Sequence, residues 1–136
     1  MAITQDGRTM SISTPKGRDF LLLNRLSATE GLSQLFTVEV ELLHEETSEG
    51  SVPKFIDPKD LLGKAVTIAI NQRDETARTI TGIVNRFSRG DRTTRSSYYY
   101  ATIVPNVWVL TQSVQSRIFQ HISVPDILKK VFKGFD

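Results

Sequence analysis

The sequence predicts a mainly β domain, a small antiparallel β-barrel or strongly curved sheet with two short helices. Several short segments alternate apolar and polar residues, which is the period of a half-buried strand. Turn-forming residues separate these segments, and well-marked helix starts occur near residues 57 and 123. About five to seven short strands joined by turns are typical of a barrel or a curved antiparallel sheet.

The first predicted strand is the short apolar run Phe20–Leu23. Ser27 and Glu30 then have the spacing of a capping box, and Gly31 can end a single turn, so a tight helical turn is predicted. The next strand covers residues 36–42, where every second residue is apolar. Its apolar face points to a core and its polar face to solvent.

The middle of the chain alternates between loops and regular elements. The polar segment 44–51 has no periodicity and predicts an exposed loop. Asp57–Gly63 contains a cap, a proline, an acidic first turn and a terminal glycine, which predict one or two turns of helix. Strands follow at residues 66–70 and 79–84, and Gly82 predicts a bulge or a close backbone approach.

The last third begins with Ser88–Ser97, which predicts the polar loop of a hairpin. Tyr98–Val104 is the next strand, ended by Pro105. A last strand is predicted at Arg117–Gln120 and a helix at Ser123–Phe132. We expect a barrel-like domain at residues 1–111, while residues 112–136 begin the next subdomain of a larger, truncated protein.

The predicted C-terminal helix has a complete start signal. Ser123 can cap its first turn, Pro125 has a suitable φ, and Asp126 occupies the third position of a capping box. The helix then has one apolar stripe, formed by Ile127, Leu128, Val131 and Phe132. Because so short a helix is marginal in water, we expect a partner or a further part of the protein to cover this stripe.

Composition limits the classes of function. The chain has 136 residues, enough for one domain, and a formal net charge of +2, which indicates neither nucleic acid nor an anionic membrane as a partner. It has no cysteine, so disulfides and thiolate chemistry are excluded. No apolar run approaches the roughly 18 residues of a membrane span, and the first residues lack a signal peptide, which predicts a protein made in the cytoplasm.

Known catalytic motifs are incomplete in this sequence. His44 and Glu45 begin a zinc-protease motif, but Ser48 stands where the second histidine is required. The segment 62–65 is similar to the end of a phosphate loop, but Pro58 stands at the upstream glycine position and Ala65 at the hydroxyl position. The segment 31–35 lacks the second glycine of a nucleophile elbow, and Ser33 has no histidine at an evident distance to activate it. With His44 and His121 the only histidines, we expect no metal, no cofactor and no catalytic residue.

Two alternatives remain open. Glu39 and Glu41 share a strand face, about 7 Å apart by strand geometry, which would suit the carboxylate pair of a small hydrolase, although a solvated sheet surface explains them better. The second alternative is a barrel that binds single-stranded nucleic acid, with cations for phosphates and rings for bases. The residues for this function are Arg86, Arg89, Arg92, Arg95 and Tyr98–Tyr100. A soluble hairpin tip accounts for these arginines equally well.

The order of several segments resembles the VgrG spike proteins of type VI secretion systems. The resemblance begins with Leu21–Phe36, which is similar to the opening signature of that family. The other matching segments, in order, are Asp60–Lys64, Gly82–Phe87, Tyr100–Pro105, Trp108–Thr111, Ser116–Gln120 and Ser123–Ile127. Small departures before Trp108 do not alter the order or spacing.

This resemblance implies a phage baseplate-hub-like fold and a structural function, without catalytic residues. A VgrG hub is a homotrimer that sits on the Hcp tube among baseplate components and helps to puncture target membranes. A PAAR-repeat tip and effectors would be held by parts absent from this sequence. The resemblance also implies assembly in the cytoplasm, export through the secretion apparatus, no nucleic acid and no stable membrane insertion by this segment. Strands from beyond residue 136 can complete the family's first barrel, so we expect an open strand edge.

Overall fold

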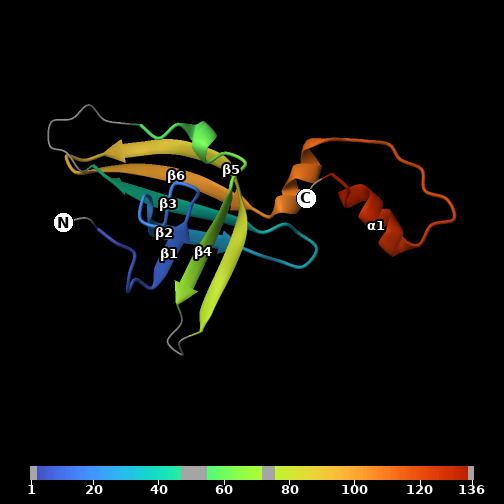
Figure 1. The fold of residues 1–136 in the computed structure, drawn as a ribbon, viewed down its shortest axis with the longest axis horizontal. Coiled ribbons are helices and arrows are strands. Elements are labelled where there is room, and N and C mark those ends of the chain that lie inside the picture. The colour runs from blue at the N-terminus through green and yellow to red at the C-terminus, as the bar shows by residue number, and fades with distance from the viewer. Residues whose placement is uncertain (1–2, 47–54, 72–75, 135–136) are drawn as a thin grey trace. The chain divides into compact units, whose positions relative to one another are not determined.

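The computed structural model describes residues 3–46, 55–71 and 76–134, which form two compact units, Met1–Pro105 and Asn106–Asp136 (Figure 1). The first unit holds β1 (Met10–Ser13), β2 (Leu22–Thr29), β3 (Thr37–Glu45), the 3₁₀ helix η1 (Pro58–Asp60), β4 (Ala65–Asn71), β5 (Ala77–Arg92) and β6 (Ser96–Val104). The second holds the 3₁₀ helix η2 (Asn106–Gln112) and helix α1 (Val124–Phe132). The predicted fold class, mainly β with short helices, is confirmed.

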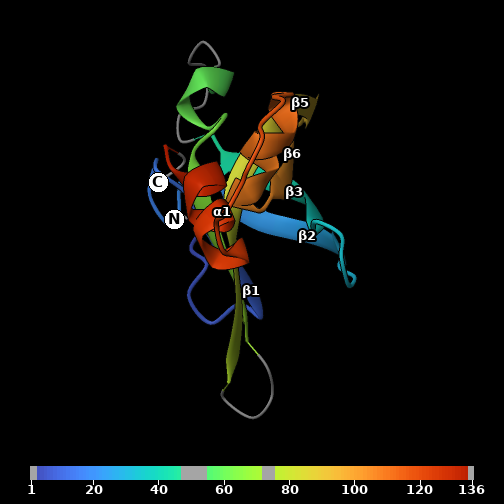
Figure 2. The same cartoon turned by 90° about the vertical axis from the view of Figure 1, so that its right-hand side faces the viewer.

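The six strands form one antiparallel sheet in the order β1-β4-β5-β6-β3-β2. Strand β5 links the two halves of this sheet, because residues 77–83 pair with β4 whereas residues 83–92 pair with β6. The register shifts between Val84 and Arg86, so one extra residue lies in β5 at this point. Such a bulge increases local twist, and the sheet curls into a half-barrel (Figures 1 and 2).

The core lies on one face of the curled sheet. The alternation predicted for residues 36–42 is confirmed, since Val38, Val40 and Leu42 are buried. Tyr99 of β6 is also buried, and its ring stacks on Phe87 with centroids 5.3 Å apart. The core also includes Ile12, Leu21, Leu23, Ile56, Leu61, Val66, Ile68, Ile80, Val84, Ala101 and Ile103.

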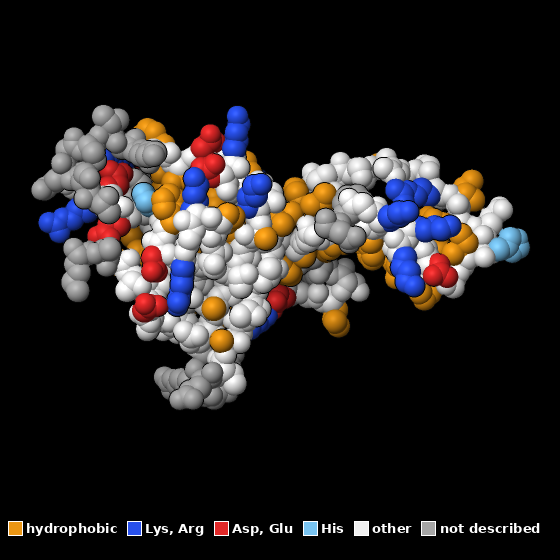
Figure 3. Space-filling view, in the orientation of Figure 1, with side chains coloured by type: hydrophobic (Ala, Val, Ile, Leu, Met, Phe, Trp, Pro, Cys, Tyr) orange, Lys and Arg blue, Asp and Glu red, His pale blue; other side chains and the backbone are white. Residues whose placement is uncertain are grey.

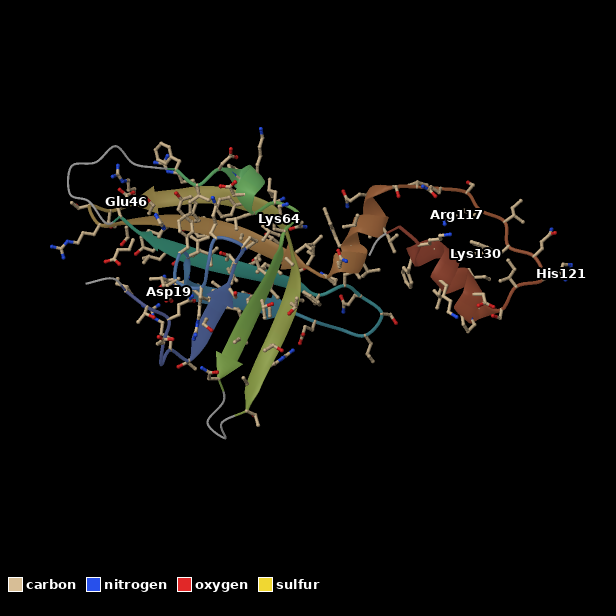
Figure 4. The ribbon with its side chains drawn as sticks, viewed as in Figure 1. Asp19, Glu46, Lys64, Arg117, His121 and Lys130 are labelled. Atoms are coloured by element: carbon tan, nitrogen blue, oxygen red, sulfur yellow. The ribbon has the colours of Figure 1, made fainter. Side chains whose placement is uncertain are left out.

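A buried glutamine joins the two edge strands of the sheet. Gln5 is 1% exposed, and its Oε1 accepts hydrogen bonds from the N–H of Ile12 in β1 (2.8 Å) and of Leu23 in β2 (3.3 Å). Its Nε2 donates to the carbonyls of Ile12 (3.0 Å) and Arg18. Asp19 holds this segment by accepting from the Gln5 N–H (2.9 Å), and Figure 4 shows Asp19 beside the sheet. One side chain therefore bonds backbone groups of both edges.

Two local predictions are confirmed. Residues 58–60 form a helical turn whose cap, Asp57, accepts a hydrogen bond from the Lys59 N–H at 3.0 Å. Gly82 marks a close approach of two strands, because a Cβ atom there would lie 2.4 Å from the carbonyl oxygen of Val104. Only glycine fits this contact without a shift of the backbone.

Strands β2, β3, β5 and β6 are longer than predicted. The helical turn expected at Ser27–Glu30 is wrong, because β2 continues to Thr29 and residues 30–36 form a non-helical connection. The predicted start of the loop 44–51 is too early, because β3 continues to Glu45. Residues 47–54 lie outside the described residues. Most of the loop expected at 88–97 is strand as well. Polar side chains on a solvent-facing strand surface resemble loop residues in sequence, which explains these errors.

The C-terminal unit departs from prediction in two details. Residues 117–120 form no strand, since no ladder pairs them within the described chain. Ser123 occupies the cap position of α1, but its Oγ donates to the Asp126 carboxylate (2.6 Å) and caps no backbone N–H. None of the helices in the described residues has the length and hydropathy to cross a membrane.

Candidate functional site: exposed interaction surfaces

The outward face of β2, β3, β6 and β5 carries two rows of polar side chains. Strand register places Arg25, Glu41, Tyr100 and Ser88 in one row. It places Ser27, Glu39, Thr102 and Arg86 in the next. These residues line a shallow hollow of about 370 Å³, which we call the polar face. Figure 3 shows positive and negative side chains interspersed on the visible side of this unit.

The polar face has charges of both signs that are free for external contacts. In residues 3–46, 55–71 and 76–134, neither Arg25 nor Arg86 takes part in an ion pair. Glu41 accepts a hydrogen bond from Asn24. Glu39 and Glu41 thus lie on an open, solvated surface beside arginine and threonine. Charges of both signs on such a surface can orient a partner of complementary charge.

The structure distributes the arginines and tyrosines of the nucleic-acid alternative over different surroundings, although Arg86 and Tyr100 both line the polar face. Arg86 lies on the polar face, whereas the Arg89 guanidinium lies over the ring of Phe55, 4.0 Å from its centroid. Arg92 forms an ion pair with Glu46 (2.6 Å). The rings are divided as well, since Tyr99 is buried in the core while Tyr100 is 44% exposed. Binding of single strands requires stacking rings along a cationic groove, whereas the hollow that Arg86 and Tyr100 share also contains the carboxylates of Glu39 and Glu41.

Glu46 connects the end of β3 to the β5–β6 hairpin. Its carboxylate accepts hydrogen bonds from Ser97 Oγ (2.6 Å), Arg92 Nε (3.1 Å) and Arg92 Nη2 (2.6 Å). The hydrogen bond from Ser97, followed by those from Arg92, lowers the pKa of Glu46 below its usual value of 4.5. Figure 4 shows Glu46 at one end of the sheet. These contacts fix the hairpin, so Glu46 and Arg92 have a structural role.

The two histidines are in different surroundings. His44 Nδ1 lies 2.8 Å from the Phe20 carbonyl oxygen, and the two rings pack with centroids 4.6 Å apart. His121 lies in the loop before α1, apart from Arg117 and Lys130 (Figure 4). Across the part of the chain that the structure describes, no three His, Asp or Glu side chains are grouped to hold a metal ion.

The C-terminal unit exposes an apolar surface. A hollow of about 280 Å³, which we call the C-terminal hollow, is lined by Leu110, Ser113, Gln115, Arg117, Phe119 and Val131. Arg117 Nη1 donates to the Lys130 carbonyl (3.4 Å), and Figure 4 shows these two residues close together. Helix α1 has no buried residue, and Leu128 and Phe132 of its apolar stripe are exposed. Within the described residues, the predicted stripe is therefore partly exposed, with Ile127 and Val131 half-buried.

The first unit is thus a curled antiparallel sheet with a polar outer face, and the second carries a hollow lined by apolar and polar side chains. Residues 29–136 match the family model described as phage tail baseplate hub (GPD), and the chain belongs to this family. The resemblance to VgrG spike proteins is confirmed by the relatives of the chain.

Two of these relatives are spike proteins of type VI secretion systems from Pseudomonas aeruginosa. The chain is 34% identical to VgrG1b and 36% identical to VgrG1c, each over 98% of its own length and 17% of theirs. It therefore spans about a sixth of these relatives. The fold is similar to that of the E. coli c3393 protein, with a TM-score of 0.61, 21% identity, and coverage of 84% of this chain and 31% of that one. The c3393 protein is described as a type VI secretion component that resembles the T4 bacteriophage tail proteins gp27 and gp5.

Proposed function

We propose that this chain is a structural hub segment of a type VI secretion spike. The observation that supports this proposal is the match of residues 29–136 to the baseplate hub family, together with VgrG relatives aligned over almost the whole chain. The segment holds its subunit in a symmetric homotrimer that sits on the Hcp tube. It acts through surface and shape, and no bond is made or broken at its residues.

The two exposed surfaces support an assembly role. The polar face carries Arg25 and Arg86, which form no ion pair within the described residues, beside the carboxylates of Glu39 and Glu41, and charges of both signs orient a contact between proteins. The C-terminal hollow and α1 also expose apolar side chains to solvent. A partner that covers these side chains removes them from water and thereby stabilises the assembly. Together they let one segment contact more than one neighbour. Residues 1–111 and 112–136 remain the proposed division into a barrel-like domain and the start of the next subdomain.

The remaining partners follow from the same proposal. Baseplate components contact the hub, whereas a PAAR-repeat tip and effectors bind parts of the protein outside this sequence. The protein assembles in the cytoplasm and leaves the cell through the secretion apparatus. It needs no cofactor, no metal and no nucleic acid, and this segment does not insert stably into a membrane.

Light scattering coupled to gel filtration tests the assembly. We expect a species of three times the monomer mass that co-elutes with purified Hcp rings. The double variant Arg25→Glu, Arg86→Glu keeps the core and reverses the free cations of the polar face, so it tests whether this face contributes. A chain that remains monomeric at high micromolar concentration and does not bind Hcp rings would contradict the proposed function.

A further inference from the structure

The first residues of the chain link the two edge strands of the sheet. Strands β1 and β2 each pair with one neighbour, β4 and β3 respectively, so no strand ladder joins them within the described residues. Residues 3–6, which we call the N-terminal latch, bring the Gln5 amide to both edges. Its Oε1 accepts from the N–H groups of Ile12 in β1 and Leu23 in β2. A side chain thus closes the curled sheet where a ladder does not.

Polar contacts hold the latch against the sheet. The Asp19 carboxylate accepts hydrogen bonds from the Gln5 N–H (2.9 Å) and from Thr4 Oγ1 (3.2 Å). The Glu45 carboxylate accepts one from the Ile3 N–H (2.8 Å). Gln5 is the buried member of the latch, whereas Ile3 is 41% exposed. Opening of the latch therefore exposes little apolar surface, and such segments open at a lower free energy than the core.

A hinge follows the latch directly. Gly7 has a φ of +72°, in the left-handed region that glycine adopts freely. One backbone hydrogen bond closes the turn around it, from the Arg8 N–H to the Gln5 carbonyl (3.2 Å). The residues after Gly7 are anchored to β4, because Asn71 donates to the carbonyls of Arg8 (3.0 Å) and Thr9 (2.8 Å). The chain before Gly7 can thus move while β1 stays in the sheet.

We propose that the N-terminal latch opens and closes as a unit about Gly7 while the six-stranded sheet stays folded. In the closed form, Gln5 protects the N–H groups of Ile12 and Leu23 from solvent. In the open form, Gln5 leaves both edges, and the unpaired backbone groups of β1 and β2 face water. The chain therefore has two forms that differ in whether the curled sheet is closed. This conformational step goes beyond the proposed structural role.

Native-state hydrogen exchange, followed by NMR on the isotope-labelled chain, tests the proposal. We expect the amides of Ile12 and Leu23 to have equal protection factors with the same weak dependence on urea, because a single opening exposes both. The amides of the β3–β6 ladder should be protected at least about ten-fold more, because only global unfolding exposes them. If Ile12 and Leu23 are protected as strongly as that ladder, the latch does not open separately and the proposal is overturned.

Two variants separate latch opening from global unfolding. Asp19→Ala removes the carboxylate that holds the latch, and Asp19 is exposed, so the sheet should still fold. Both the open and the unfolded forms lack this contact, so protection should fall by about ten-fold at Ile12, at Leu23 and in the β3–β6 ladder alike. The matched variant is Ile103→Val, in the buried part of β6 that stays folded when the latch opens. It should lower protection of the ladder by roughly two- to ten-fold and leave Ile12 and Leu23 unchanged.

Two results of these variants would overturn the latch. If Ile103→Val lowers protection at Ile12 and Leu23 as much as in the ladder, the latch and the sheet unfold together. If Asp19→Ala leaves protection at Ile12 and Leu23 unchanged, the polar contacts of the latch do not hold the edges. Neither result bears on the proposed function, because exchange is measured within one chain whereas assembly is measured by light scattering.

Discussion

Gln5 provides a sharp test of how the curled sheet is held, because this one side chain bonds both sheet edges. Replacement by leucine keeps the approximate volume and removes every hydrogen bond of the amide. The Ile12 N–H, the Ile12 carbonyl and the Leu23 N–H then lose their Gln5 partner. Gln5 is almost fully buried, so water cannot easily take its place.

The cost of Gln5→Leu follows from these three buried groups. A buried polar group without a partner costs about 1–3 kcal/mol. Taking the low end for each group, because leucine adds apolar contacts, gives a loss of about 3 kcal/mol in the free energy of unfolding. This is a large part of the roughly 5–15 kcal/mol that stabilises a typical domain.

Urea unfolding followed by far-ultraviolet circular dichroism measures this loss. The matched control is Gln120→Leu, in which an exposed glutamine is replaced and the change should stay within about 0.5 kcal/mol. If Gln5→Leu lowers the free energy of unfolding by less than about 1 kcal/mol, the glutamine does not hold the two edges together.

Three further predictions concern other parts of the first unit. Gly82→Ala should lower the free energy of unfolding, measured by urea titration, by roughly 1–3 kcal/mol. The reason is that the added methyl group would meet the Val104 carbonyl. The control is Thr79→Ala on the same strand. The lowered pKa of Glu46 contributes stability that is present above pH 4.5 and is lost as the pH falls through the folded-state pKa. Glu46→Gln should therefore flatten the pH dependence of the thermal midpoint in this range, and an unchanged pH profile would contradict the role of the carboxylate. Titration with single-stranded DNA at two salt concentrations should show no micromolar binding, and steeply salt-dependent binding that Arg86→Ala weakens would instead support the nucleic-acid alternative.

The candidate surfaces were only partly predictable from the sequence. The apolar stripe of α1 was identified from helical spacing, because that spacing depends on local geometry alone. The grouping of Arg86 with Glu39 and Glu41 was missed, since it depends on which strands lie side by side. The exposed turn at Leu32 was missed because the residues before it have the spacing of a capping box, although extended pairing of β2 with β3 prevails there.

Gln5 also lacked a signal in the sequence. An isolated glutamine near the start of a chain is ordinarily an exposed residue. Its role arises from contacts with Ile12 and Leu23, and the edge strands that carry them meet only after the sheet has curled. Such a role follows from long-range packing and has no local pattern.

The sequence by itself determined the fold class, the buried face of β3, the turn at Asp57 and the close approach at Gly82. It also indicated the protein family, through the order of several segments. These features depend on local periodicity, on backbone freedom at single residues, or on the linear order of motifs. Tertiary structure alone decided the strand order, the lengths of the hairpins, the separation of the arginines and the exposure of Leu32. The physical reason is that hydrogen bonds and burial between distant segments fix register and exposure, and a polar strand surface has the same composition as a loop.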